Sequence, residues 1–215
     1  MLKYKNKQLN CHSLLYKTTK LIKTMKINKF GRARILSAEE LDTLIDAIPY
    51  SSHKVLAIWL RYTGARVSEG LKSKWEYYTD THFIYPAPTT KTKETRKIPI
   101  NPKLRLELDT WKAYIKPESN NEYIFKGRFG SHLTRQSMDK KLKQYSPYKG
   151  VSTHSFRRSC LTALNRAKVP LNVIASLSGH SSMNSLRLYL GIDENEQIEA
   201  INLLWFLSFY LYWKR

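Results

Sequence analysis

Acidic residues and cysteines are both scarce in this chain of 215 residues. Only 17 Asp and Glu oppose 37 Lys and Arg, which leaves a formal charge of +20. A chain of that charge is expected to bind an anionic partner, nucleic acid before acidic lipid. The two cysteines, Cys11 and Cys160, are too few for a disulfide framework. They favour a reduced, intracellular setting, in the cytoplasm and associated with DNA.

Long apolar runs are lacking too. The strongest one, Leu203 to Trp213, has 11 residues and contains Ser208, so it is too short to cross a bilayer as a helix. The N-terminus has no apolar segment followed by a cleavage site, so we expect no signal peptide and no membrane partner. No carboxylate cluster or Cys/His pairing predicts a metal site, and we expect no metal, no cofactor and no small-molecule substrate.

The pattern of apolar residues predicts an α+β fold that is mainly helical. A capping box at Ser37 to Glu40 begins one helix, and an apolar helix from about 53 to 62 is expected to lie deep in the core. Residues 82–85 and 95–100 read as short strands, and residues 102–115 and 134–145 as amphipathic helices. Residues 1–34 hold ten Lys or Arg and no acid, which predicts a basic arm, either helical or disordered.

The segment from 153 to 189 has the residues best suited to chemistry. Thr153 is expected to cap a helix whose first turn carries His154 and Arg157, three residues apart on one face. That turn has free backbone N–H groups and the positive end of the helix dipole, so the pair is suited to hold an anion. The expected buried stripe of this helix is apolar: Phe156, Cys160, Ala163, Leu164 and Ala167.

Three further residues set the ends of the helices that follow. Pro170 ends this helix or begins the next, and Gly179 suits a left-handed position at the end of that next helix. The turn at Gly179 would direct His180 away from the helix. A last short helix, begun at 181 or 182, is expected to carry Tyr189.

These residues resemble the motif of the tyrosine recombinases, or phage integrases. The family reads H-x-x-R, then G-H, then a tyrosine nine residues later, and His154 to Arg157, Gly179-His180 and Tyr189 have that spacing. Thr63 to Glu69, TGARVSE, resembles the first box of the family, in which Arg66 would bind the scissile phosphate. Gly64 permits a tight turn there, and Ser68 or Glu69 can steady the backbone behind the arginine.

The resemblance covers about residues 35–192 and implies an integrase-type catalytic domain with a small antiparallel sheet of about three strands. It implies a DNA strand-transferase that needs no metal, with Tyr189 as nucleophile and Arg66, His154, Arg157 and His180 around the phosphate. The general acid would be Lys91, with Lys93 as its rival. We expect further DNA contacts from basic residues of the sheet and helices: Lys93, Arg96, Arg135, Lys140 and Arg158.

The partners expected from the resemblance are double-stranded DNA and further copies of the chain, as a tetramer on DNA. The tail at 193–215 would dock in trans or fold back onto its own core. With its short basic N-terminal segment, the chain is more like the archaeal viral or plasmid integrases, or like a truncated copy that lacks the core-binding domain. A type IB topoisomerase and a non-catalytic DNA-binding remnant are the alternative functions.

Overall fold

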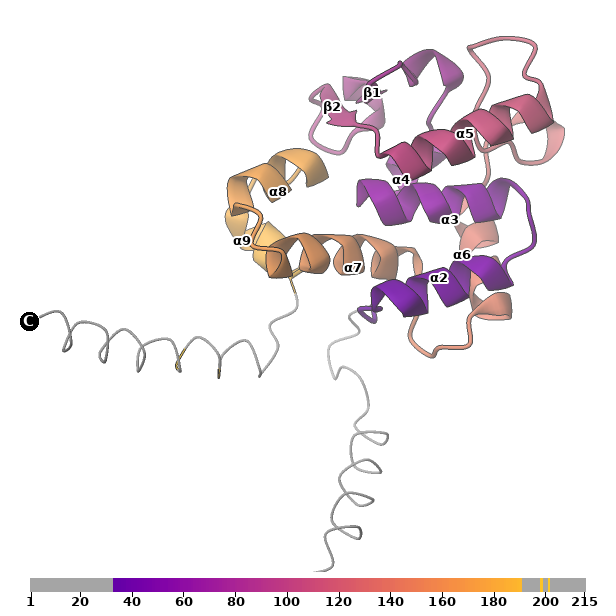
Figure 1. Ribbon diagram of the computed structural model, residues 1–215. Helices are drawn as coiled ribbons and strands as arrows, with labels where there is room; N and C mark the ends of the chain where they lie inside the picture. The colour runs from indigo at the N-terminus through magenta and orange to yellow at the C-terminus, as the bar shows by residue number, and fades with distance from the viewer. Residues whose placement is uncertain (1–32, 191–197, 199–200, 202–215) are drawn as a thin grey trace, which may run out of the picture. The chain divides into compact units, whose positions relative to one another are not determined.

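The computed structural model describes residues 33–190, 198 and 201 (Figure 1). Most of the expected arm (1–34) and tail (193–215) therefore lies outside the described residues. In chain order, the α-helices are α2 Ala38–Ala47, α3 Ser52–Thr63, α4 Val67–Leu71, α5 Pro102–Ile115, α6 Arg135–Tyr145, α7 Thr153–Arg166, α8 Leu171–Ser178 and α9 Met183–Arg187. The strands are β1 His82–Tyr85 and β2 Arg96–Pro99, and the 3-10 helices are η1 Trp75–Tyr77, η2 Ala87–Thr89 and η3 Arg128–Gly130.

Helix α3 is the centre of the main core, as its apolar sequence predicts. It contacts α5, α2 and α7, and it lies between α5 and these last two in Figure 1. Trp59 of α3 is fully buried and packs edge-on against Phe83, Tyr85 and Phe125, with ring centroids 5.7–6.0 Å apart. The contacts with Phe83 and Tyr85, which belong to β1, pack the sheet against α3.

The sheet has two antiparallel strands in the described part of the chain, where about three were expected. Phe83 pairs with Ile98, and Tyr85 with Arg96. In place of a third strand, Tyr78 forms one isolated antiparallel bridge with Phe83 of β1. The residues before Tyr78 form the 3-10 turn η1 and so cannot continue a strand. The mainly helical fold with a small sheet is nevertheless the one that the sequence predicts.

Helix α7 differs from the expectation at its start and on its buried face. Ser152, in extended conformation, is the N-cap, and Thr153 is already helical. The apolar residues Ala163 and Ala167 are exposed. The buried face instead contains these residues: Thr153, Ser155, Phe156, Arg157, Ser159, Leu161 and Thr162. The hydroxyl of Ser159 is tolerated there because it finds a backbone partner: Ser159 Oγ accepts a hydrogen bond from the Leu36 N–H at 2.7 Å.

A second, smaller core joins α7, α8 and α9. Its buried members are Leu161, Ile174, Ala175 and Leu186. Pro170 is the N-cap of α8, in line with one of the two expectations for it. Helix α9 ends at Arg187, so Tyr189 follows the helix instead of lying within it, which corrects the expectation. Among the residues described, we find no helix with the length and apolar character needed to span a membrane.

Candidate active site

The turn after α3 places Arg66 and fixes its side chain. Gly64 ends α3 with φ +58°, a conformation that favours glycine, and Arg66 then begins α4. Glu69, only 1% exposed, accepts hydrogen bonds from the Arg66 backbone N–H at 2.8 Å and from its Nη1 at 3.2 Å. Glu69, not the exposed Ser68, therefore steadies this backbone. The Arg66 guanidinium is held partly buried in one orientation.

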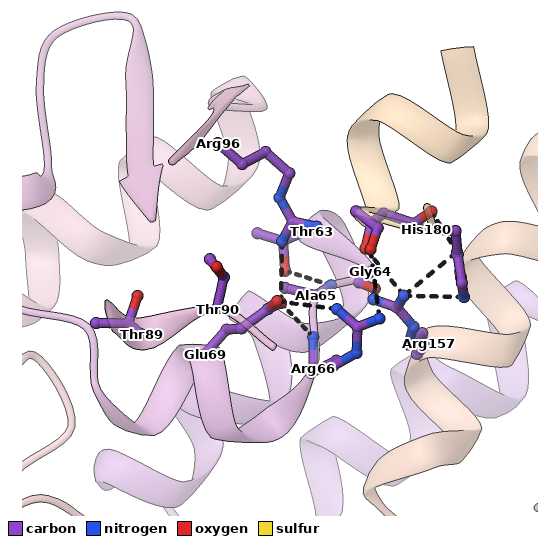
Figure 2. A network of polar contacts seen from close by, with 12 residues as sticks. Thr63, Gly64, Ala65, Arg66, Glu69, Thr89, Thr90, Arg96, Arg157 and His180 are labelled. Atoms are coloured by element: carbon purple, nitrogen blue, oxygen red, sulfur yellow. Dashed lines mark hydrogen bonds and ion pairs between the residues drawn. The ribbon is translucent and has the colours of Figure 1, made fainter. Parts of the chain in front are cut away.

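Arg157 enters the same region from the first turn of α7. Its side chain is 1% exposed, and its Nη1 donates to the carbonyl of Gly64 at 2.8 Å while its Nη2 donates to that of Ser178 at 2.9 Å (Figure 2). Burial, and after it the neighbouring Arg66, lowers the pKa of Arg157 to about 10. The guanidinium therefore stays charged at neutral pH. It links the turn after α3 to the end of α8.

The turn that ends α8 carries His180. Gly179 has φ +67°, the left-handed cap that the sequence predicts, and its carbonyl accepts from Arg66 Nη2 at 3.3 Å. The His180 ring is half buried, and its Nε2 lies 3.2 Å from Arg157 Nη2. Burial, then Arg157, Arg66 and Arg96, lowers the pKa of His180 to about 4. Its imidazole is neutral at physiological pH.

Tyr189 and His154 complete the group. The Tyr189 ring lies 5.0 Å from that of His180 between centroids, and the Arg157 guanidinium lies 5.2 Å above the same tyrosine ring. His154 is half buried, and its pKa is lowered first by burial and then by Arg135, Arg157 and Arg66. The two arginines bond to consecutive carbonyls, those of Ser178 and Gly179, and so point into one site.

The two lysines considered as general acid lie on the loop between β1 and β2. Lys91 and Lys93 are both exposed, and Lys93 has φ +56°. The residues on either side of Lys91, Thr90 and Thr92, line a pocket of about 220 Å³ together with His180. The loop thus reaches the edge of the site, although no contact joins either lysine to the arginines or histidines.

Two of the basic residues expected on a DNA surface are directed inward. Arg96 Nη2 donates to Glu69 at 2.9 Å (Figure 2). Its guanidinium lies 4.7 Å from the centroid of the Tyr85 ring. The Arg158 guanidinium donates to the carbonyl of Ala33. Ala33 and Arg34, placed in the arm by the sequence, thereby pack on the domain, and the Arg34 N–H also donates to the carbonyl of Gly150 at 3.0 Å.

The other two, Arg135 and Lys140, are exposed on α6. Arg135 Nε lies 3.5 Å from Asp139 Oδ2, an ion pair within α6. Both side chains are close enough to His154 to affect its pKa, which Arg135 lowers and Asp139 raises. Lys140 lines a groove of about 710 Å³ between α6, the start of α3 and the residues around η3. Lys141, on the same basic face of α6 that the sequence suggests could follow a duplex, also lines this groove. Lys126 and Arg128, which line it too, were not predicted from the sequence. Their spacing in the chain gave no signal, because the groove forms only when η3 folds against α6.

In the described residues, no three His, Cys, Asp or Glu side chains gather in a way that could hold a metal ion.

Comparison with known proteins finds recombinases. The chain is 28% identical over 137 residues to tyrosine recombinase XerC of Neisseria meningitidis serogroup C, an alignment that covers 61% of this chain and 44% of the relative. It is 28% identical over 185 residues to tyrosine recombinase XerD of Chlamydia trachomatis serovar D, covering 78% and 61%. The chain therefore spans about half the length of these relatives.

Solved structures share the fold. A crystal structure of XerA recombinase superposes with a TM-score of 0.68 at 18% identity, over 79% of this chain and 64% of the other. A dimer of lambda integrase bound to a core site superposes with a TM-score of 0.61 at 18% identity, over 76% and 61%. A model of the phage integrase family matches residues 34–196, most of the chain. The chain belongs to the phage integrase family.

Proposed function

We propose that this chain is the catalytic part of a site-specific DNA recombinase or integrase that breaks and rejoins strands through a 3′-phosphotyrosyl intermediate. The observation that carries the proposal is the convergence of two guanidiniums, Arg66 and Arg157, on one turn. That turn also bears His180, and the Tyr189 ring lies beside it. Two fixed cations beside a phenol and an imidazole suit attack on a phosphodiester.

The reaction needs charge stabilisation above all. Arg66 and Arg157 would hold the non-bridging oxygens of the phosphate as negative charge builds there, a kind of contact worth roughly 3–4 kcal/mol per well-placed donor. In the cleavage step, the bond from Tyr189 Oη to phosphorus forms as the phenol loses its proton to water or to a neighbouring imidazole, and the bond from phosphorus to the 5′-oxygen breaks. The leaving oxygen takes a proton, which Lys91 would supply, with Lys93 as the alternative. Attack by a 5′-hydroxyl reverses the step and rejoins the strand.

Duplex DNA is the proposed partner, and the groove beside α6 supports it. Four cationic side chains, including Lys140, line this groove, and no carboxylate does. Arg135 lies at the start of the same helix, close to His154. Such a surface can follow a phosphate backbone, with an affinity that falls steeply as salt rises.

Assembly and setting are also proposals. Among solved proteins with this fold, XerH is described as bound to its difH substrate and lambda integrase as a dimer on a core site. We propose that this chain likewise self-associates on DNA, as a tetramer, inside the cell. The role of the tail at 193–215 and the archaeal origin stay predictions. The relatives are recombinases by name, which favours strand exchange over topoisomerase activity.

The test uses a nicked duplex that traps the covalent intermediate, with its sequence drawn from repeats that flank the gene. Wild-type protein is expected to form a covalent DNA adduct, and Tyr189→Phe is expected to form none. Tyr114→Phe is the matched control, because it removes an exposed phenol far from the arginines. Folded wild type that forms no adduct on any duplex, a random library included, would favour the binding remnant. Relaxation of any supercoiled plasmid would favour the topoisomerase.

A further inference from the structure

Arg96, the first residue of β2, is buried beside the phosphate site and touches three other elements. Its side chain is only 12% exposed, and its Nη2 donates to Glu69 Oε2 of α4 at 2.9 Å (Figure 2). Its guanidinium lies 4.7 Å from the centroid of the Tyr85 ring of β1. A β-carbon built on Gly179 would fall 2.0 Å from Arg96 Nη1, so the guanidinium also lies directly against the backbone at the end of α8.

Arg66 meets two of these same groups. Its Nη1 donates to Glu69 Oε1 at 3.2 Å, and its Nη2 donates to the carbonyl of Gly179 at 3.3 Å. Glu69 and Gly179 therefore lie between the two arginines, and the four residues form a closed ring of contacts. Because Arg96 restrains both of the groups that Arg66 touches, a movement of Arg96 would shift both supports of Arg66.

The ring also decides how much charge Arg66 can offer to a phosphate. Glu69 is 1% exposed, so its negative charge is balanced by the neighbouring cations and not by water. With Arg96 in place, two guanidiniums share one carboxylate and a net positive charge remains. Without Arg96, the carboxylate would pair with Arg66 alone, and their attraction in a buried setting would draw this guanidinium toward Glu69 and offset its charge.

We propose that Arg96 is a positioning residue, which holds the Arg66 guanidinium in one orientation through Glu69 and Gly179 and leaves it a net positive charge for the phosphate. The orientation follows from the contacts alone, whereas the effect on catalysis rests on the proposed DNA cleavage. Arg96 itself does not touch the DNA. The guanidinium of Arg66, 20% exposed, presents its remaining N–H groups to the non-bridging oxygens.

The first measurement is NMR of the full chain with ¹³C,¹⁵N-labelled arginine, without DNA, which reports the rotation of each guanidinium. Wild-type Arg66 is expected to give separate signals for its two Nη groups, because each has its own acceptor. Arg96→Lys keeps a charge beside Glu69 but lacks the planar fork, so the Arg66 signals should average. Arg61→Lys, which alters an arginine paired with Asp42 outside this ring, is the matched control and should leave Arg66 unchanged. Averaged signals in wild type, or separate signals in Arg96→Lys, would overturn the proposal.

The second measurement follows adduct formation on the nicked duplex at saturating DNA, well below the melting temperature of each variant. Arg96→Lys is expected to slow this step roughly 3- to 10-fold and Arg96→Gln roughly 10- to 100-fold, less than the loss of a donor that touches the phosphate itself. DNA affinity and its dependence on salt should not change. Lys97→Gln, which removes an exposed cation from the next position of β2, is the matched control and should cleave at the wild-type rate.

A DNA contact made by Arg96 would give a different pattern: weaker binding in Arg96→Gln, a salt slope smaller by about 1, and a wild-type rate at saturation. That pattern, or Arg96 variants that only melt earlier and cleave at the wild-type rate, would overturn the proposal. If Arg96→Gln does not fold, Arg96→Lys and the wild-type spectrum still decide it. A wild type that never cleaves would instead refute the proposed function and leave the NMR result to decide whether Arg96 positions Arg66.

Discussion

The two sides of the site stand on cores of very different size. The Arg66 side, residues 63–69, is built on α3 and on the main core with its buried aromatic rings. The side that carries His180 and Tyr189 is built on α8 and α9, and its core has four buried members. Arg66 thus stands on the larger core and Arg157 on α7, which takes part in both cores, while Tyr189, the proposed nucleophile, packs on the smaller one.

That difference predicts how each side moves. A segment held by few buried contacts opens at a lower free-energy cost than one anchored in the main core. The two sides are joined by polar contacts, in which the Arg157 guanidinium bonds to Gly64 and to Ser178. We therefore expect the segment with Arg66 to stay folded, and the segment with His180 and Tyr189, where the covalent bond would form, to open locally at a lower free-energy cost.

The largest change in stability is expected from Glu69→Gln, a substitution on the Arg66 side of the site. The change leaves the guanidiniums of Arg66 and Arg96 without their shared buried carboxylate. Breaking a buried ion pair from one end costs about 3–5 kcal/mol, so the unfolding free energy in urea should fall by about that much. Glu94→Gln, an exposed carboxylate on the loop between β1 and β2, is the control and should change it by less than about 0.5 kcal/mol. Equal losses in both variants would contradict the prediction.

A smaller and local effect is expected from Leu186→Ala, a substitution in the smaller core beneath His180 and Tyr189. Leu186 is fully buried in the small core, and its truncation should raise amide hydrogen exchange in residues 178–190 while α3 stays protected. The comparison variant is Leu60→Ala in the main core, which should lower the global unfolding free energy by about 2–5 kcal/mol. If Leu186→Ala exposes α3 as much as α9, the two cores form one cooperative unit and the comparison fails.

The smallest effect is expected from pH, because the His180 imidazole makes the unfolding free energy depend on pH. Burial lowers the folded pKa of His180 to about 4, while the unfolded side chain titrates near 6.5. The unfolded chain then binds a proton that the folded ring does not, so stability is full above pH 6.5 and falls as pH drops toward 4. Melting temperatures from pH 7 to 4 should fall less steeply in His180→Gln. His154 and His53, whose pKa values are also lowered by burial, would leave a residual slope.

What the sequence predicted well was local chemistry at helix ends. Gly179 was predicted to adopt a left-handed turn and Gly64 to permit a tight turn, and both have positive φ, a conformation that few other residues tolerate. The spacing of His154, Arg157, His180 and Tyr189 followed from the family resemblance, and the structure places the last three against one another. For His154 it shows an electrostatic influence of Arg157 and Arg66 on the pKa. The catalytic roles of these residues stay predictions. Glu69 was one of two residues expected behind Arg66, and only the structure chose between it and Ser68.

What the sequence missed depends on contacts between distant elements. The buried face of α7 was expected to be apolar, yet Ser159 is buried because it meets the backbone of Leu36, 123 residues away. Arg96 was expected on a DNA surface, since a charge on a short strand is usually solvated. Only tertiary packing reveals the buried carboxylate at Glu69 that it meets. Tyr189 was placed within a helix that ends two residues earlier, an error of helix boundary.

The absence of a side chain at Gly179 has a consequence for variation in this protein. A β-carbon at that position would lie 2.0 Å from Arg96 Nη1, and the backbone there already requires a left-handed turn. Any larger residue would have to displace the Arg96 guanidinium, one of the two cations that pair with Glu69, while Arg96 itself stays in β2. Strand β2 and the end of α8 are therefore free to diverge only together, so libraries that randomise one of them should vary the other in the same clones.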